Sequence, residues 1–156
     1  MRKFALVLLL FSALPLFASE TVIFAVRHAE KATDGSADPA LTAEGVARAA
    51  SLARILRDAG VTVVYSTPTT RTRTTARPLG IPVTEDASAP EALARRILRE
   101  NRGKNVLVVG HSNTVPLLLK ALGVSSPPAI GDNDFDNLFV AVVPEKGATR
   151  LIRLHY

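Results

Sequence analysis

Short runs of β-branched and apolar residues alternate with helical segments along most of the chain. The runs typical of strands span residues 21–26, 61–65, 81–84, 105–109, 138–143 and 149–155. Helical segments begin near Thr42, Pro68, Ser88 and Thr114. Alternation of this kind requires crossover connections between parallel strands, whereas the last two strands form an antiparallel hairpin. The sequence therefore predicts an α/β fold: a three-layer α/β/α sandwich with a mainly parallel sheet and a C-terminal antiparallel hairpin.

Charged and polar side chains directly follow three of these strands. Arg27 and His28 end the first strand, Arg71 lies shortly after the second, and His111 follows the most apolar strand, residues 105–109. In sheets of this type ligands bind beyond the carboxyl ends of the strands. We therefore expect two histidines and two arginines to lie together at one edge of the sheet.

This set of side chains suits phosphoryl transfer without a metal. Arginine binds phosphate oxygens through two parallel N–H bonds and stays charged. A neutral imidazole is a nucleophile when its second nitrogen is held by a hydrogen bond, and a second, protonated histidine stabilises the charge of the transition state. A carboxylic acid then protonates the leaving oxygen.

Four motifs resemble those of one known family, and they occur in that family's order. They are Arg27-His28-Ala29-Glu30, Leu41-Thr42-Ala43-Glu44-Gly45, the segment Tyr65-Ser66-Thr67-Pro68-Thr69-Thr70-Arg71-Thr72-Arg73-Thr74-Thr75-Ala76, and Val108-Val109-Gly110-His111-Ser112. Together they resemble the histidine phosphatase superfamily, in the branch that holds the cofactor-dependent phosphoglycerate mutases and the phosphohistidine phosphatases.

The resemblance implies a role for each matching residue. His28 is expected to be the nucleophile that forms a phosphohistidine. Arg27, Arg71 and His111 are expected to form the phosphate pocket, and Asn113 adds a donor at the next helix start.

The proton donor of the family is expected in the short stretch of residues 84–87. There Asp86 is favoured over Glu85 because it lies further past the strand end. Some family members lack this acid and cleave substrates with good leaving groups, such as phosphohistidine. The chain also lacks the insertions of the mutases, which favours hydrolysis over phosphate transfer.

These expectations describe a phosphoric monoester hydrolase that acts on a small phosphorylated substrate without a cofactor or metal. Three alternatives stay open: a catalytically inactive phosphate-binding or regulatory domain of the same fold, a phosphotransferase of the phosphoglycerate mutase type, and a zinc site formed by His28, His111 and a carboxylate. The arginines oppose the zinc site because they would repel a cation.

Residues 1–18 have the layout of a secretory signal peptide. Arg2 and Lys3 precede an apolar run that reaches Leu14, and small residues follow near Ala18. We therefore expect a cleaved signal, a periplasmic or secreted protein without stable membrane contact, and a phosphatase domain over residues 19–156. An uncleaved membrane anchor is the alternative.

Composition narrows the partners of the domain. The chain contains no cysteine, which excludes disulfides and thiolate metal sites. The formal net charge of the chain is +5, which falls to about +3 without Arg2 and Lys3 of residues 1–18, and the arginines are scattered over several segments. A modest excess of this kind suits small anionic substrates and does not indicate nucleic acid as a partner.

Overall fold

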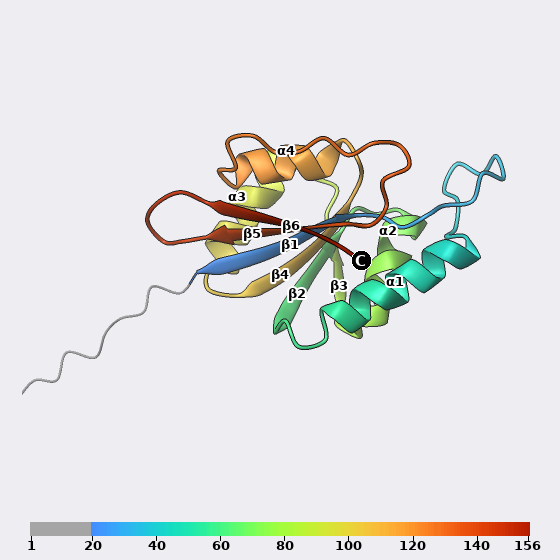
Figure 1. Ribbon diagram of the computed structural model, residues 1–156, viewed down its shortest axis with the longest axis horizontal. Helices are drawn as coiled ribbons and strands as arrows, with labels where there is room; N and C mark the ends of the chain where they lie inside the picture. The colour runs from blue at the N-terminus through green and yellow to red at the C-terminus, as the bar shows by residue number, and fades with distance from the viewer. Residues whose placement is uncertain (1–19) are drawn as a thin grey trace, which may run out of the picture.

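The computed structural model describes residues 20–156 as one six-stranded sheet with helices on both faces (Figure 1). In chain order the elements are β1 (Thr21–Arg27), α1 (Ala43–Ile55), β2 (Val61–Ser66), α2 (Thr70–Ala76), the 3₁₀ turn η1 (Arg77–Leu79), β3 (Val83–Glu85), α3 (Pro90–Glu100), β4 (Asn105–Gly110), α4 (Thr114–Ala121), β5 (Asn137–Val143) and β6 (Arg150–His155). The predicted fold class is confirmed.

The strands lie in the order β3-β2-β4-β1-β5-β6. Pairing is parallel between β1 and β4, between β2 and β4, and between β2 and β3. The strand β5 pairs antiparallel with both β1 and β6, so the closing hairpin forms one edge of the sheet. The parallel strands β1, β2 and β4 therefore end side by side, which brings the segments that follow them together.

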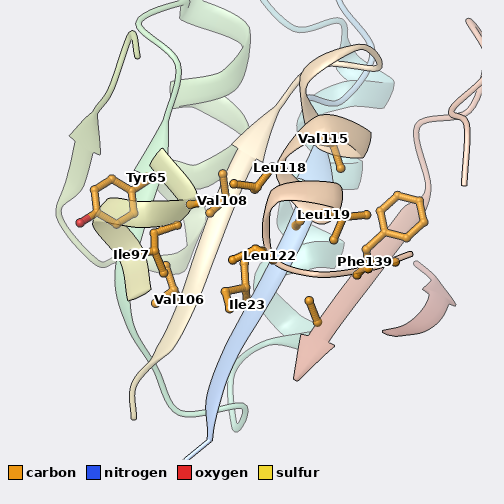
Figure 2. Close-up of a cluster of buried hydrophobic side chains, with 14 of the residues drawn as sticks. Ile23, Tyr65, Ile97, Val106, Val108, Val115, Leu118, Leu119, Leu122 and Phe139 are labelled. Atoms are coloured by element: carbon orange, nitrogen blue, oxygen red, sulfur yellow. The ribbon is translucent and has the colours of Figure 1, made fainter. Parts of the chain in front are cut away.

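Each face of the sheet has its own buried core, because successive side chains of a strand point to opposite faces. Val106 and Val108 of β4 pack against α3 and α4, in the core drawn in Figure 2. Leu107 and Val109 pack on the other face, in the core that α1 and α2 cover. Burial on both faces explains why this strand reads as an unbroken apolar run.

Of the four predicted helix starts, those at Thr42 and Thr114 agree with the structure. The hydroxyl of Thr42 accepts a hydrogen bond from the amide of Gly45, at 3.1 Å, and so caps α1. The second helix begins at Thr70 rather than at Pro68, and the side chain of its N-cap residue, Thr69, caps no backbone amide. The segment Ser88-Ala89-Pro90-Glu91 fits the pattern of a capping box at Ser88, but Ala89 is the N-cap residue of α3 and makes no side-chain cap bond.

No helix within residues 20–156 combines the length and the apolar character needed to cross a membrane. The predicted signal peptide, residues 1–18, lies outside the described residues.

Candidate active site

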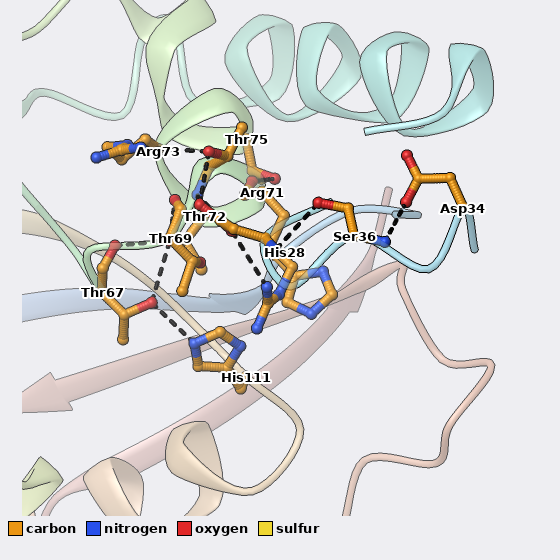
Figure 3. A network of polar contacts seen from close by, with 12 residues as sticks. His28, Asp34, Ser36, Thr67, Thr69, Arg71, Thr72, Arg73, Thr75 and His111 are labelled. Atoms are coloured by element: carbon orange, nitrogen blue, oxygen red, sulfur yellow. Dashed lines mark hydrogen bonds and ion pairs between the residues drawn. The ribbon is translucent and has the colours of Figure 1, made fainter. Parts of the chain in front are cut away.

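The two histidines meet where β1 and β4 end. The amide of His28 donates to the carbonyl of Gly110 at 2.9 Å, which continues the parallel pairing one residue past β1. As a result the rings of His28 and His111 lie edge to face, with their centroids 5.3 Å apart and an interplanar angle of 68°. The sheet thus brings together two residues that are far apart in the sequence, as the strand ends predict (Figure 3).

The ring of His28 is held in one orientation by its own neighbour. Its Nδ1 lies 2.7 Å from the carbonyl oxygen of Ala29. Because a carbonyl oxygen only accepts hydrogen bonds, Nδ1 carries the proton, and Nε2 of the neutral ring carries a lone pair. The backbone of Ala29 is held in turn, since its amide donates to the hydroxyl of Thr75 on α2 at 3.0 Å.

His28 is neutral at pH 7. Its side chain is buried, with 4% of the residue exposed. Burial lowers the pKa of His28 to about 4, and the Ala29 carbonyl opposes this shift. The positive charges of His111, Arg27 and Arg71 add to the lowering. A buried neutral imidazole with a free lone pair is the form that acts as a nucleophile.

Arg27 is buried beside His28 and binds the loop that precedes β5. Its Nη1 donates to the carbonyl oxygens of Gly131 and Asp132, both at 2.8 Å, and to that of Asp134 at 3.4 Å. The ring of Phe135 lies against the guanidinium, with 4.1 Å from Cζ to the ring centroid. These contacts use one nitrogen of the guanidinium and hold the others beside His28.

Arg71 reaches the same place from α2. Figure 3 shows its guanidinium between the rings of His28 and His111. Its Nη1 lies 3.5 Å from Oδ1 of Asp38. The Nε atoms of Arg71 and Arg27 are both buried, and neither has a hydrogen-bond partner within residues 20–156. Buried cationic donors without partners are costly, and a bound anion would supply the acceptors that these two atoms lack.

His111 is half-buried and is held by Thr67, the residue that follows β2. Its Nε2 lies 2.8 Å from the Thr67 hydroxyl. Burial lowers the pKa of His111, and the charges of Arg71 and Arg27 lower it further. Both effects favour the neutral form of His111, whereas the sequence predicts a protonated ring, and this role stays a prediction.

The cap of α2 comes from a distant loop, which sequence reasoning missed. Asp38 accepts hydrogen bonds from the amide of Thr70, at 3.0 Å to each oxygen, and from its hydroxyl at 2.7 Å. This contact fixes the first turn of α2, from which Arg71 projects. Loop contacts of this kind have no periodicity in the sequence, so no local pattern indicates them.

Threonines of α2 support both histidines, and they too were missed. Thr72 and Thr75 are buried, and Thr75 donates to the carbonyl of Arg71 at 2.8 Å while accepting from Ala29. One signal for them was present: threonine is a poor helix former, yet it recurs through this short helix. Such a concentration indicates that the hydroxyls serve contacts rather than helix stability.

The two candidate proton donors lie outside this cluster and have other partners. Asp86 accepts from Arg96 at 2.9 Å and from both the amide and the hydroxyl of Ser88. Burial raises the pKa of the Asp86 carboxyl, but the Ser88 bonds and Arg96 outweigh burial and lower the pKa below its usual value. Glu85 is exposed and pairs with Arg73 at 3.2 Å. These contacts favour the deprotonated form of Asp86, and its role as an acid stays a prediction.

Arg73 and Asn113 make no contact with the histidines. Arg73 pairs with Glu85, away from the site, as expected of an arginine two residues along the helix from Arg71. Asn113 is the exposed N-cap residue of α4 and makes no side-chain cap bond. Its role as a phosphate donor stays a prediction.

Cavities near and far from the histidines differ in character. A small, mostly apolar cavity of about 40 Å³ lies beside the site, between Thr67, Asp86, Leu93 and Thr114. A larger one of about 490 Å³ lies between α1, η1 and β2, and its titratable lining residues are Arg54 and Arg57. We place the chemistry at the histidines, because neither a nucleophile nor an acid lines the larger cavity.

Within residues 20–156, no three histidine or carboxylate side chains come together in a way that could hold a metal ion. The zinc alternative therefore gains no third ligand from the part of the chain that the structure describes.

Comparison with known families tests the resemblance of the four motifs to the histidine phosphatases. A sequence model of the histidine phosphatase superfamily (branch 1) matches residues 23–92. The resemblance to this superfamily is confirmed. The matched range holds the histidine phosphatase motifs around His28, Thr42 and Arg71, whereas His111 lies beyond it. No protein of curated function matches the chain in sequence.

Solved structures show the same histidine phosphatase fold. The protein histidine phosphatase SixA in complex with tungstate is 21% identical, with a TM-score of 0.70, and the match covers 86% of this chain and 96% of that one. Phosphoserine phosphatase of Entamoeba histolytica, in complex with 3-phosphoglyceric acid, is 16% identical (TM-score 0.66; 87% and 97% covered). YhfR of Bacillus stearothermophilus is 18% identical (TM-score 0.65; 84% and 95% covered).

Proposed function

We propose that the protein is a phosphatase that hydrolyses phosphate monoesters, or phosphohistidine, through a phosphohistidine intermediate on His28. One observation carries the proposal. The Nδ1 proton of His28 is bound to the Ala29 carbonyl, which leaves the Nε2 lone pair near Arg27 and Arg71, whose buried Nε donors have no partner within residues 20–156. A nucleophile and donors suited to an anion thus adjoin each other.

Each residue then has a chemical task. Nε2 of His28 attacks the phosphorus, while the bond of Nδ1 to Ala29 disperses the positive charge that develops on the ring. Arg27 and Arg71 bind the phosphate oxygens and stabilise their charge in the transition state. Water attacks the phosphohistidine in the second step and releases phosphate.

Similar structures support an anionic substrate. SixA was solved with tungstate, and the phosphoserine phosphatase with 3-phosphoglyceric acid. Both ligands are small oxyanions or phosphorylated acids, in agreement with the modest positive charge of this chain. The substrate class that we propose is therefore small phosphorylated molecules, without nucleic acid as a partner.

The contacts of Asp86 favour substrates with good leaving groups. A carboxylate that is bound to Arg96 and Ser88 holds no proton at pH 7. If Asp86 is the acid, then Asp86→Asn slows alkyl phosphates far more than aryl phosphates, because an aryl oxide leaves without protonation. Equal effects on both would show that another residue is the acid.

The contacts of Asp86 with Arg96 and Ser88 also favour the second candidate function, a phosphate-binding domain without turnover, because they leave the site without a protonated acid.

A substrate panel on residues 19–156 tests the proposal. We expect turnover of aryl phosphates and of phosphohistidine that persists in the presence of chelator and is abolished by His28→Ala. His155→Ala is the matched control, because His155 is exposed and pairs with Asp136, away from the site. Binding of phosphate or vanadate without turnover of any ester would establish the binding-only function instead. Turnover that chelator removes would contradict the mechanism.

We also propose that residues 1–18 are a cleaved signal peptide and that the domain is periplasmic or secreted. The support is the basic start, the apolar run and the small residues near Ala18. Mass spectrometry of the protein expressed with its full sequence tests this directly. We expect a mature N-terminus at residue 19. A membrane-bound protein that retains residues 1–18 would show an anchor.

A further inference from the structure

A chain of hydroxyl groups leads from His111 to the backbone of the segment between β2 and α2. Nε2 of His111 lies 2.8 Å from Oγ1 of Thr67, and Oγ1 of Thr67 lies 3.0 Å from Oγ1 of Thr72. The Thr72 hydroxyl in turn lies 2.7 Å from the carbonyl oxygen of Thr67 and 3.0 Å from that of Thr69. Figure 3 shows these contacts side by side.

The direction of this chain follows from counting protons. A hydroxyl has one proton to donate, and a carbonyl oxygen has none. The Thr72 hydroxyl faces two carbonyl oxygens, so its proton is used there, and its lone pairs accept from the hydroxyls of Thr67, at 3.0 Å, and Thr69, at 2.8 Å. If Thr67 instead donated to His111, the 3.0 Å contact between the Thr67 and Thr72 hydroxyls would have no proton. Every contact has a proton only when Thr67 donates to Thr72 and accepts from Nε2–H of His111.

We propose that Thr67 and Thr72 are positioning residues that hold His111 as the Nε2–H tautomer, so that Nδ1 is the nitrogen that meets the phosphate. The inference deepens the proposed phosphatase function and rests on it. Figure 3 shows the ring edge of His111 opposite Thr67 on the side of His28 and Arg71. Thr72 is fully buried, which protects the hydroxyl chain from water and strengthens it.

This tautomer has a consequence for the ionic form of the substrate. In a neutral Nε2–H ring, Nδ1 accepts hydrogen bonds and cannot donate them. The groups that face His111 are His28, Arg27 and Arg71, and none of them offers it a proton: His28 is neutral and the arginines are cations. The proton between Nδ1 and a phosphate oxygen therefore enters with the substrate, as the hydroxyl of a phosphate monoanion. We infer that the site takes the monoanion.

Nitrogen NMR of the histidine rings in the substrate-free protein tests the tautomer. The described chain has His28, His111 and His155, which the variants His28→Asn and His155→Asn assign. At pH 7 we expect the Nε2 signal of His111 at the position of a protonated nitrogen and the Nδ1 signal at that of an unprotonated one. A His111 ring with the proton on Nδ1 would overturn the proposal.

Variants of the hydroxyl chain separate positioning from simple packing. Thr67→Val removes the acceptor, so we expect the His111 signals to move toward a mixture of tautomers and kcat/KM to fall about tenfold, the effect of one lost hydrogen bond. Thr67→Ser restores the hydroxyl and both readouts. Thr74→Val is the matched control, because this threonine of α2 makes no side-chain hydrogen bond within the described residues. Unchanged nitrogen signals in Thr67→Val would contradict the proposal.

The pH dependence of kcat/KM tests the monoanion separately. The second pKa of a phosphate monoester is about 6, so kcat/KM for such a substrate is expected to decline above this pH in the wild-type protein. A plateau that extends to pH 8 would overturn the inference on the ionic form. Because the tautomer is read without substrate, absence of all phosphatase activity would refute the proposed function and would leave the assignment of Nε2–H to be judged by NMR alone.

Discussion

The guanidinium of Arg27 lies on the ring of Phe135, 4.1 Å from its centroid, while the same ring lies 6.2 Å from that of His28. One aromatic side chain thus borders both the proposed nucleophile and a proposed phosphate ligand. The loop that carries it is otherwise exposed and is bound to Arg27 through the carbonyls of Gly131 and Asp132. Arg27 therefore joins the anion site to the loop that borders it.

Replacing Phe135 is expected to weaken the hold on Arg27. A cation–π contact of this kind contributes about 1 kcal/mol, so Phe135→Leu should raise KM for a phosphate ester about fivefold with a smaller effect on kcat. Steady-state kinetics measures both. Phe135→Tyr keeps the ring and serves as the control. A change in kcat alone, with KM unchanged, would show that the ring does not act through phosphate binding.

Two arginines of the same helix allow a matched comparison. Arg71 faces the histidines, whereas Arg73 pairs with Glu85 on the surface. Arg71→Ala removes a charge-assisted contact of about 2 kcal/mol, which predicts a loss of about thirtyfold in the affinity for vanadate. Arg73→Ala should leave the affinity within twofold, because an exposed ion pair contributes little. Equal losses in titration calorimetry would place the anion elsewhere.

The low pKa of His28 predicts a dependence of stability on pH. In the unfolded chain a histidine titrates near pH 6.5, whereas His28 in the fold titrates at about 4. Between these values the unfolded state binds the proton and the folded state does not, so stability falls as the pH falls from about 6.5 to about 4. The free energy of unfolding should drop by about 3 kcal/mol over this range.

Urea titrations at pH 7 and pH 4.5 measure this drop, and His28→Asn should reduce it while His155→Asn leaves it intact. Protonation of His28 also limits activity at low pH, because a protonated ring has no lone pair for attack. An identical pH dependence in wild type and His28→Asn would contradict the burial of a neutral ring.

Gly45 is predicted to tolerate no side chain. A Cβ at this position of α1 would overlap the backbone carbonyl of Glu30, two residues after His28. Overpacking of this kind costs about 1–3 kcal/mol, so Gly45→Ala should lower the free energy of unfolding by that amount and reduce turnover. Ala47→Ser, at an exposed position of the same helix, is the control. Wild-type stability of Gly45→Ala would show that α1 and the segment after β1 are not packed rigidly.

The fold and the meeting of two histidines and two arginines could be predicted because both depend on chain order. Parallel strands must end on one side of a sheet, so residues that directly follow them meet there: His28 after β1, Arg71 after β2 and His111 after β4. The packing of β4 between two layers followed from its unbroken apolar run.

The supporting contacts could not be predicted, because they join segments without periodicity. Asp38 caps α2 from a loop far back in the sequence, and Arg96 holds Asp86 across the start of α3. The hydrogen bond from Arg27 to the loop at Gly131 is accepted by a backbone carbonyl, which every residue has. Sequence patterns indicate which side chains are buried, but they do not indicate which loop carbonyl a buried arginine will bind.

Trapping the phosphorylated enzyme tests the mechanism most directly. The protein is mixed with a ³²P-labelled aryl phosphate, quenched in alkali, in which phosphohistidine survives, and digested for mass spectrometry. We predict that the label resides on His28, in the peptide of residues 28–48 that cleavage after arginine alone produces. His28→Asn should carry no label, while His111→Asn should still carry it at a lower level. Label on another residue, or turnover without any labelled protein, would contradict the assignment of His28 as the nucleophile.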